Sequence, residues 1–242
     1  MNFNKIEKLV IEEKMFFLVL YRFNSSRVYE KNLRPFCKSN LLDIKLRQLK
    51  DSGIPKENII LCGDYHEDID GFSVVDRDID YVIDNNISFS DTLVHIYDKI
   101  KESGFNINHL FFTYPTSPMF NDIMYKKAIY SYYKNVMTGE HDSIISGVNK
   151  KGFFWKDGKT VNYSSDENHQ YTQDIKPVFE CNNAFWGGKF DILKKRKYFV
   201  GDNPFLMDVP GLFSIDIDTM EDFKMAELIF SNYMNGFFND IY

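Results

Sequence analysis

The sequence predicts an α/β fold with a doubly wound, mostly parallel sheet. The prediction depends on three continuous apolar runs, each followed by a segment with the apolar spacing of an amphipathic helix. The runs cover 15–21, 58–62 and 109–113, and the helical segments cover 41–49, 88–100 and 122–133. Apolar runs without alternation are typical of strands buried on both faces of a parallel sheet. Regular alternation of strand and helix therefore favours βαβ units.

The first two expected strands are bounded by clear turn signals. The run at 15–21 reads Met-Phe-Phe-Leu-Val-Leu-Tyr and is followed by a polar loop. The helix expected next has Leu42, Leu46 and Leu49 on one face, because residues four and seven positions apart lie together on a helix. The run at 58–62 follows a Gly-Ile-Pro turn, so we expect a second strand there.

The next elements repeat the same unit. Ser88 or Ser90 is the expected cap of the helix at 88–100, because a serine hydroxyl accepts hydrogen bonds from the free amides of a first helical turn. The strand at 109–113 ends at a turn with two prolines, after which the helix at 122–133 is expected.

The second half of the chain is less regular. A fourth strand is expected at 142–148. The periodicity is then lost between 152 and 180, where Trp155-Lys-Asp-Gly158 is typical of a hairpin turn, so we expect a β arm. A last strand is expected at 212–217.

The final expected element is a helix that ends near Ser231. Asp218 or Thr219 is its candidate cap, because both side chains accept hydrogen bonds from amides of a first helical turn.

Composition and charge narrow the classes of function. The chain has 242 residues, of which 44% are apolar and 26% charged, as in globular proteins. Its net charge of −6 argues against a surface built for a nucleic-acid backbone or an anionic membrane. Cys37, Cys62 and Cys181 are scattered, which argues against a disulfide framework or a zinc knuckle. With no export signal visible in the sequence, we expect a cytoplasmic protein.

The loop after the first strand is cationic in an otherwise acidic chain. Arg22, Arg27 and Lys31 lie within eleven residues together with two serines. Arginine and lysine suit phosphate oxygens, so a polyanion is the expected ligand. The loop lacks the Gly-rich order of a P-loop and of a dinucleotide fingerprint, which excludes both. A solvated charged loop is the alternative interpretation.

Two later loops carry further polar groups at the expected ligand edge of the sheet. Asp216 and Asp218 would project from the same side of a strand end, where two carboxylates could share one divalent cation, and hard oxygen ligands favour magnesium. An edge aspartate plus a helix cap is the alternative. The segment 114–118, Tyr-Pro-Thr-Ser-Pro, offers two hydroxyls, although a plain turn explains it equally well.

Together these loops resemble the CMP-sugar synthetases, the cytidylyltransferases that activate sialic acid, related nonulosonic acids and Kdo. The resemblance covers about residues 15–233 and is most specific at its closing signature, I-D-I-D-T-x-E-D-x-x-x-A-E. The matching segments are Tyr21–Asn32, Thr113–Pro118, Asp142–Gly147, Asn182–Trp186 and Ile215–Glu227.

The resemblance implies an organisation of the chain and a reaction. It implies a Rossmann-like nucleotidyltransferase domain at 15–233 that includes a dimerisation arm at 152–180, with an N-terminal extension at 1–14 and a C-terminal tail at 234–242. The implied protein is a homodimer that serves surface polysaccharide or glycoconjugate biosynthesis. It would transfer CMP from CTP, with magnesium, to an acceptor oxygen and release pyrophosphate.

The resemblance also implies roles for individual residues. Arg22, Lys31, Asp216 and Asp218 are the implied catalytic residues, and the two aspartates are the implied magnesium ligands. The implied nucleotide site consists of Arg22, Asn24, Ser25, Ser26, Arg27, Lys31, Asn32, Tyr114 and Thr116. The implied acceptor site consists of Tyr114, Gln173 and Asn183.

Three departures from the family pattern concern the acceptor. The family's R-R-Q segment reads His-Gln-Tyr-Thr-Gln over 169–173, and Thr172 cannot replace a bidentate guanidinium. Tyr114 replaces a glutamine, and Ser26-Arg27 replaces Lys-Gly as in the Kdo branch. We therefore expect either a sugar acid of the nonulosonic or Kdo type or an atypical phosphorylated or phosphonate acceptor.

Two alternative functions stay open at this point. Asp216-Ile-Asp218 is also a DxD pattern of GT-A glycosyltransferases, although only one helix follows it here. The substitutions at Tyr114 and Thr172 would also suit a degenerate family member that serves as a dimeric scaffold.

Overall fold

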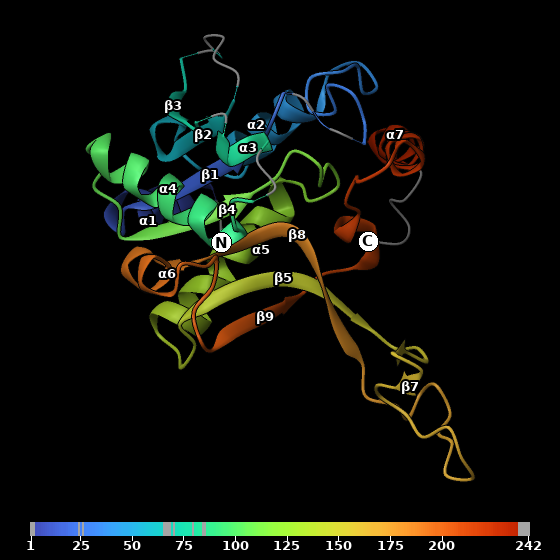
Figure 1. Ribbon diagram of the computed structural model, residues 1–242. Helices are drawn as coiled ribbons and strands as arrows, with labels where there is room; N and C mark the ends of the chain where they lie inside the picture. Colours follow the sequence, from blue (N-terminus) through green and yellow to red (C-terminus); the bar gives the residue numbers. More distant parts are fainter. Residues whose placement is uncertain are drawn as a thin grey trace.

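A computed structural model describes residues 3–23, 25, 27–64, 69, 71–78, 80–83 and 86–236, and it confirms the predicted α/β fold. A seven-stranded sheet with the order β3-β2-β1-β4-β8-β5-β9 forms its centre (Figure 1). The strands are β1 Met15–Leu20, β2 Ile59–Gly63, β3 Ser73–Asp76, β4 His109–Thr113, β5 Ser143–Lys150, β8 Val178–Lys189 and β9 Pro204–Asp208.

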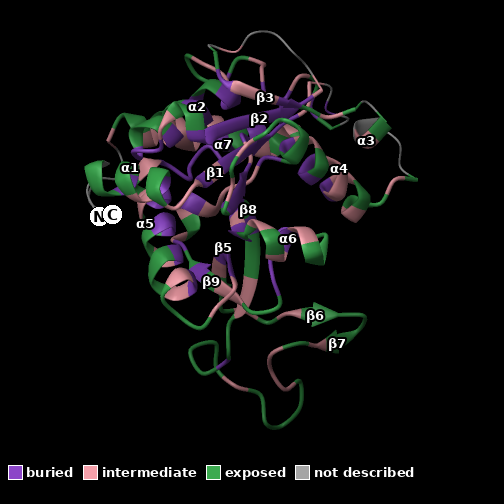
Figure 2. Ribbon diagram, turned by 90° about the vertical axis from the view of Figure 1, so that its left-hand side faces the viewer, coloured by how far each residue is buried: buried purple, intermediate pink, exposed green. Residues whose placement is uncertain are grey.

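The helices lie on both faces of this sheet (Figure 2). The helices are α1 Phe3–Glu12, α2 Leu41–Asp51, α3 Asp80–Ile83, α4 Phe89–Glu102, α5 Asp122–Tyr132, α6 Phe190–Arg196 and α7 Met220–Met234. Helices α1, α2 and α5 cover one face, and α4 and α6 cover the other. A π-turn at Tyr133–Met137 follows α5, and a 3₁₀ turn at Lys56–Asn58 precedes β2.

Most of the sheet is parallel, as predicted. Strand β1 pairs in parallel with β2 and β4, β2 with β3, and β5 with β9, whereas β8 runs antiparallel to both β4 and β5. The carboxyl ends of β1, β2, β3 and β4 therefore meet at one edge, and the loops that follow them lie together.

Aromatic side chains fill the core on the side of α2 and α5. The rings of Phe17, Phe111 and Phe185 stack across three neighbouring strands, with centroids 5.1 and 4.9 Å apart. Each is fully buried. Burial of a phenylalanine contributes about 2–3 kcal/mol, and stacked pairs add to this, so this face fixes the sheet on which the loops are built.

Helix caps agree with the sequence at two predicted positions. Ser88, rather than Ser90, caps α4 by accepting a hydrogen bond from the amide of Asp91. Thr219, rather than Asp218, caps α7 in a capping box with Asp222. The side chain of Asp218 is therefore not the cap of this helix.

The strand predicted at 212–217 is wrong. A 3₁₀ turn occupies Gly211–Ser214, and an extended segment outside the sheet follows it. Strand β9, which precedes this segment in the chain, pairs with β5 at the edge of the sheet instead. Pro210 precedes the turn, and the amide of Ile217 instead donates to the carbonyl of Thr116 at 2.9 Å.

Several elements lack a strong sequence signal. Helix α1 lies in the segment expected as an extension, where Ile6 and Val10 are buried in the core. Strand β8 begins inside the stretch expected as irregular, and the short elements β3, α6 and β9 were not predicted.

The arm between β5 and β8 extends away from the sheet (Figure 1). It contains the predicted hairpin, formed by β6 Trp155–Lys156 and β7 Lys159–Thr160. Asp157 and Gly158 have φ angles of +51° and +74°, the sign that a type I′ turn requires at both central positions. In the described part of the chain, no helix has the length and apolar character needed to cross a membrane.

Candidate functional site

The predicted loops meet around one pocket of about 470 Å³ at the carboxyl ends of β1 and β4. Residues that the sequence singled out come from four separate parts of the chain. Those that line the pocket are Arg22, Arg27, Lys31, Asn32, Tyr114, Thr116, Asn183, Asp216 and Asp218. The convergence predicted from the sequence is therefore present in the geometry.

The cationic loop and the acidic segment are joined by direct contacts. Lys31 Nζ donates a 2.6 Å hydrogen bond to the carbonyl of Ile217 and lies 3.9 Å from Asp218 Oδ1. Arg27 Nη2 lies 2.8 Å from the same Asp218 oxygen. Cations and carboxylates thus alternate along one wall of the pocket, which suits a ligand that carries both phosphates and a divalent cation.

Lys31 is the buried member of this group. Its side chain is only 9% exposed, whereas those of Arg27 and Asp218 are about half exposed. Burial lowers the pKa of the Lys31 ammonium, and the charges of Asp218 and Asp216 act in the opposite direction. The position of this charge is therefore fixed by the fold, while the exposed Arg27 pair is free to exchange partners.

Main-chain contacts shape the cationic loop. The amide of Phe23 donates to Asp64 Oδ1 at 2.6 Å, and the side-chain amide of Asn32 donates to the carbonyl of Arg22 at 2.9 Å. Two buried polar atoms in this loop, Ser25 Oγ and Asn32 Oδ1, have no hydrogen-bond partner in the described part of the chain. Buried polar groups normally have a partner, so these two atoms are open to an ordered water or a polar ligand. The predicted residues Asn24 and Ser26 lie outside the described residues.

A bulge in β8 places Asn183 at the pocket. The pairing of β5 with β8 shifts between Ile145 and Gly147, and Asn183 in the bulge has a φ of +53°. Its side-chain amide donates to Asp216 Oδ2 at 3.0 Å. The other oxygen of this carboxylate is buried and has no partner among the described residues.

The two aspartates fit the magnesium ion that the resemblance implies. Asp216 offers a buried oxygen that has no partner among the described residues, and Asp218 offers a half-exposed carboxylate that faces the exposed Arg27 and the buried Lys31. Among the residues that the structure describes, no cluster of three or more acidic, histidine or cysteine side chains could hold a metal. Two carboxylates match magnesium in particular, because it commonly takes one or two carboxylates and completes its shell with water and substrate phosphates.

The turn after β4 brings its residues to the pocket floor. Tyr114 and Thr116 line the pocket, as predicted. Burial raises the pKa of the Tyr114 phenol, so this hydroxyl is neutral at physiological pH and can donate a hydrogen bond.

Arg77 is a pocket residue that the sequence analysis missed. It follows β3, donates from Nη2 to the carbonyl of Tyr21 at 3.2 Å, and its Nε is buried with no partner among the described residues. The signal was available, since Arg77 is a cation directly after a short run with Val74 and Val75, but the run was too short to be recognised as a strand.

An aromatic wall, also missed, closes the pocket on the side of α6. It consists of Trp186, Tyr198 and Phe199, all of which line the pocket. The ring centroids of Trp186 and Phe199 are 5.5 Å apart, and Trp186 Nε1 is a buried donor with no partner in the described part of the chain. One part of the pocket is thus charged, whereas this wall presents aromatic rings, the Tyr198 hydroxyl and the Trp186 donor.

Gln173, predicted to contact the acceptor, is not brought to this pocket. It lies on the arm, where its carbonyl accepts a hydrogen bond from Lys151 Nζ at 2.8 Å. Thr172 lies beside it and is exposed.

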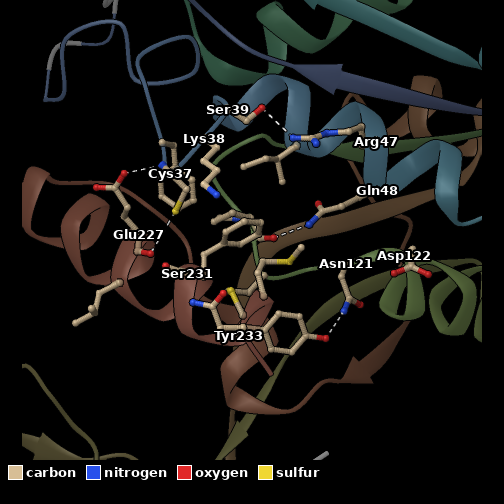
Figure 3. A pocket seen from close by; sticks show the side chains of 18 of the residues that line it. Cys37, Lys38, Ser39, Arg47, Gln48, Asn121, Asp122, Glu227, Ser231 and Tyr233 are labelled. Atoms are coloured by element: carbon tan, nitrogen blue, oxygen red, sulfur yellow. Dashed lines mark hydrogen bonds between the residues drawn. The ribbon is translucent and has the colours of Figure 1, made fainter. Parts of the chain in front are cut away.

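A larger cavity of about 860 Å³ lies between α2, α7 and the loop that follows Asn32 (Figure 3). It is lined mostly by apolar atoms, and its labelled side chains belong to no predicted site residue. Gln48 in its wall donates to the carbonyl of Pro118 at 2.6 Å. The chemistry that the sequence predicts lies in the smaller pocket, where the charged groups gather.

One characterised relative matches nearly the whole chain. Pseudaminic acid cytidylyltransferase of Campylobacter jejuni is 24% identical over 229 residues, which cover 89% of this chain and 96% of the relative. No protein-family model matches the sequence.

Solved structures share the fold at low sequence identity. The 4-diphosphocytidyl-2C-methyl-D-erythritol synthase of Anaerococcus prevotii superposes with a TM-score of 0.58 at 12% identity, covering 90% of this chain and 99% of that one. CMP:2-keto-3-deoxy-manno-octonic acid synthetase, solved with CTP, gives 0.57 at 11% identity with the same coverage. A cytidylyltransferase of Leptospira borgpetersenii gives 0.55 at 16% identity, covering 88% of this chain and 85% of that one. The comparisons confirm the predicted fold, resemblance and class of enzyme.

Proposed function

We propose that this chain, a nucleotidyltransferase of the CMP-sugar synthetase type, transfers CMP from CTP to an oxygen of a sugar acid and releases pyrophosphate. The observation that supports this most strongly is the meeting of Arg27 and Lys31 with Asp218 across one pocket. A pocket lined by four cationic side chains and two carboxylates is suited to a nucleoside triphosphate with its divalent cation.

The chain's own residues bind and orient the triphosphate in this proposal. Arg22, Arg27 and Lys31 hold the phosphates and stabilise the charge that grows on the leaving pyrophosphate as the α-phosphorus to oxygen bond breaks. Arg77, which also lines the pocket, donates to the nucleotide. Lys31 is held by the carbonyl of Ile217, so its charge needs little reorganisation during the reaction.

Asp216 and Asp218 would hold the magnesium ion, which when bound polarises the phosphate and offsets its negative charge. Asn183 keeps the Asp216 carboxylate turned toward the pocket by donating to one of its oxygens. The proton of the attacking hydroxyl passes to a carboxylate of this pair as the new oxygen to phosphorus bond forms.

The aromatic wall indicates the nature of the acceptor. Trp186, Tyr198 and Phe199 present apolar rings, which suit a sugar acid with apolar substituents such as acyl or deoxy groups. Pseudaminic acid, named in the relative, is a nonulosonic acid, so we propose an acceptor of that class. Kdo-like, phosphorylated and phosphonate acceptors are the competing outcomes.

Pyrophosphate release tests the proposal directly. The protein is incubated with magnesium and each of the four nucleoside triphosphates, together with nonulosonic acids, Kdo and small phosphorylated or phosphonate acceptors. We expect release only with CTP and a nonulosonic acid, and loss of release in an Asp218→Asn control. Turnover of a nucleotide sugar without pyrophosphate release would favour the glycosyltransferase, and absence of magnesium-dependent CTP binding in calorimetry would favour a scaffold.

We also propose that the arm at 152–180 joins two copies of the chain. Its Phe153, Trp155 and Tyr171 are 45%, 58% and 75% exposed, an unusual amount of apolar surface for a solvated arm. Light scattering is expected to give a dimer, and Trp155→Ser with Tyr171→Ser is expected to weaken it, whereas Tyr130→Ser on α5 should not. A monomer at micromolar concentration contradicts this assignment.

A further inference from the structure

Lys45 in α2 is a fully buried lysine that the proposed reaction does not use. None of its surface is exposed to solvent. Its ammonium donates to the carbonyls of Ser117 at 2.8 Å and Phe120 at 3.2 Å. It also lies 5.0 Å from the centroid of the Tyr125 ring. These partners all belong to the turn after β4 or to the helix α5 that follows it.

A lysine ammonium that is fully buried requires an explanation, because burial removes its hydration. Burial lowers the pKa of Lys45 to about 7, and the charge of Asp216 acts in the opposite direction. Elsewhere the same face of α2 is occupied by Leu42, Leu46 and Leu49, which bury apolar area without loss of hydration. Stability alone therefore does not favour a lysine at this position.

The Lys45 ammonium provides hydrogen-bond donors to the turn that follows β4. Three main-chain carbonyls of the turn accept hydrogen bonds from α2, and the donors are the side chains of Lys45 and Gln48. Lys45 donates to the carbonyls of Ser117 and Phe120. Gln48 donates to that of Pro118 at 2.6 Å (Figure 3). A carbonyl that is buried without a donor loses its hydration, so these bonds hold the turn against the helix.

The same turn supports the reactive pocket on its other side. Tyr114 and Thr116 line the pocket, and the carbonyl of Thr116 accepts the amide hydrogen of Ile217 at 2.9 Å. Ile217 stands between Asp216 and Asp218 in the chain, and its carbonyl accepts from Lys31. Two sets of hydrogen bonds, joined by the main chain between Thr116 and Ser117, thus connect α2 with the acidic pair.

We propose that Lys45 is a positioning residue, which fixes the turn at 114–120 and so holds Tyr114, Thr116 and the acidic pair in place at the pocket. The part of the proposal that concerns acceptor turnover rests on the proposed function. The part that concerns the turn itself does not, because it can be measured in the protein without ligands.

The first experiment follows amide hydrogen exchange in the protein alone. In Lys45→Met the apolar volume is kept and the donors are lost. Exchange in the peptides that cover 114–121 and 215–218 is expected to become at least about tenfold faster, because the Ile217 amide depends on the position of Thr116. Leu49→Ala, which opens a cavity on the same helix and removes no hydrogen bond to the turn, is the matched control for lowered stability.

The second experiment separates the two substrates. In Lys45→Met, kcat/KM for the acceptor is expected to fall on the order of 10- to 100-fold, as for other small displacements of reacting groups. The affinity for CTP in calorimetry is expected to stay within about threefold, since most of the phosphate contacts come from other loops. Lys45→Gln, which restores one donor, should recover part of the loss.

The outcomes are distinguishable. Faster exchange in both peptides with no turnover of any acceptor by the parent protein would support Lys45 as a positioning residue and contradict the proposed function. Unchanged exchange in Lys45→Met, or an equal loss of kcat/KM in Leu49→Ala, would overturn the proposal.

Discussion

The ammonium of Lys31 donates a 2.6 Å hydrogen bond to the main-chain carbonyl of Ile217, 186 positions further along the chain. This single contact joins the loop after β1 to the segment that carries both aspartates. Because Lys31 is almost fully buried, the contact is shielded from water and fixes the distance between the cationic and acidic walls of the pocket.

Replacement of Lys31 by methionine is expected to lower the rate of CMP transfer by about 10²–10³-fold, the loss seen when one donor aimed at developing charge is removed. Methionine keeps most of the apolar volume, so the fold should persist. Pyrophosphate release under saturating substrates measures the effect. Lys126→Met, which removes a lysine paired with Asp122 on α5, is the control and should retain the parent rate.

Asp218→Asn is expected to raise the magnesium concentration needed for half-maximal rate and to lower the maximal rate by about 10²-fold, because an amide oxygen carries no charge for the cation. The Arg27 pair is about half exposed, so the free energy of unfolding should change by less than about 1 kcal/mol. A magnesium titration of pyrophosphate release tests the first expectation. Glu221→Gln, at the exposed start of α7, should behave as the parent, and an unchanged titration in Asp218→Asn would remove this residue from the metal site.

Arg77→Met is expected to weaken CTP binding by about 10- to 100-fold, because hydrogen bonds to charged groups contribute about 1.5–3 kcal/mol. The Nε of Arg77 has no partner among the residues that the structure describes, and we expect the nucleotide to accept a hydrogen bond from it. Calorimetry with CTP and magnesium measures the loss. Arg47→Met in the larger cavity serves as control, and equal affinities for the two variants would place the nucleotide elsewhere.

The sequence was most informative where an element is long or follows a strong chemical rule. The three apolar runs were found nearly to the residue, because strands buried on both faces leave no room for polar residues. The cationic loop was found because clustered cations stand out in an acidic chain, and the acidic pair was found from the spacing of Asp216 and Asp218. The structure brings the two together.

The failures have physical reasons. The segment at 212–217 has the apolar character of a strand, but β9 already pairs with β5, and only tertiary pairing decides between two such segments. Arg77 follows a strand of four residues, too short to give a periodic signal. Trp186 and Phe199 belong to different elements, so the wall that they form exists only after folding.

His109 in β4 provides a test of stability against pH. Its side chain is buried and its Nδ1 lies 2.8 Å from the Tyr132 hydroxyl. Burial, with a smaller effect from the charge of Lys189, lowers the pKa of His109 to about 4, against about 6.5 in an unfolded chain. Between these values the unfolded state binds more protons than the folded state, so stability falls as the pH is lowered from 6.5 to 4.

The expected loss attributable to His109 is on the order of 2 kcal/mol at pH 4.5 relative to pH 7. Chemical denaturation of the parent and of His109→Gln at both pH values measures it, since glutamine does not titrate and retains hydrogen-bonding groups for Tyr132. Carboxylates that titrate in the same range affect both proteins equally. The change in the free energy of unfolding between the two pH values, compared between the two proteins, therefore isolates the effect of this histidine. If the free energy of unfolding changed by the same amount in both proteins, His109 would accept a proton in the folded protein as readily as in the unfolded one.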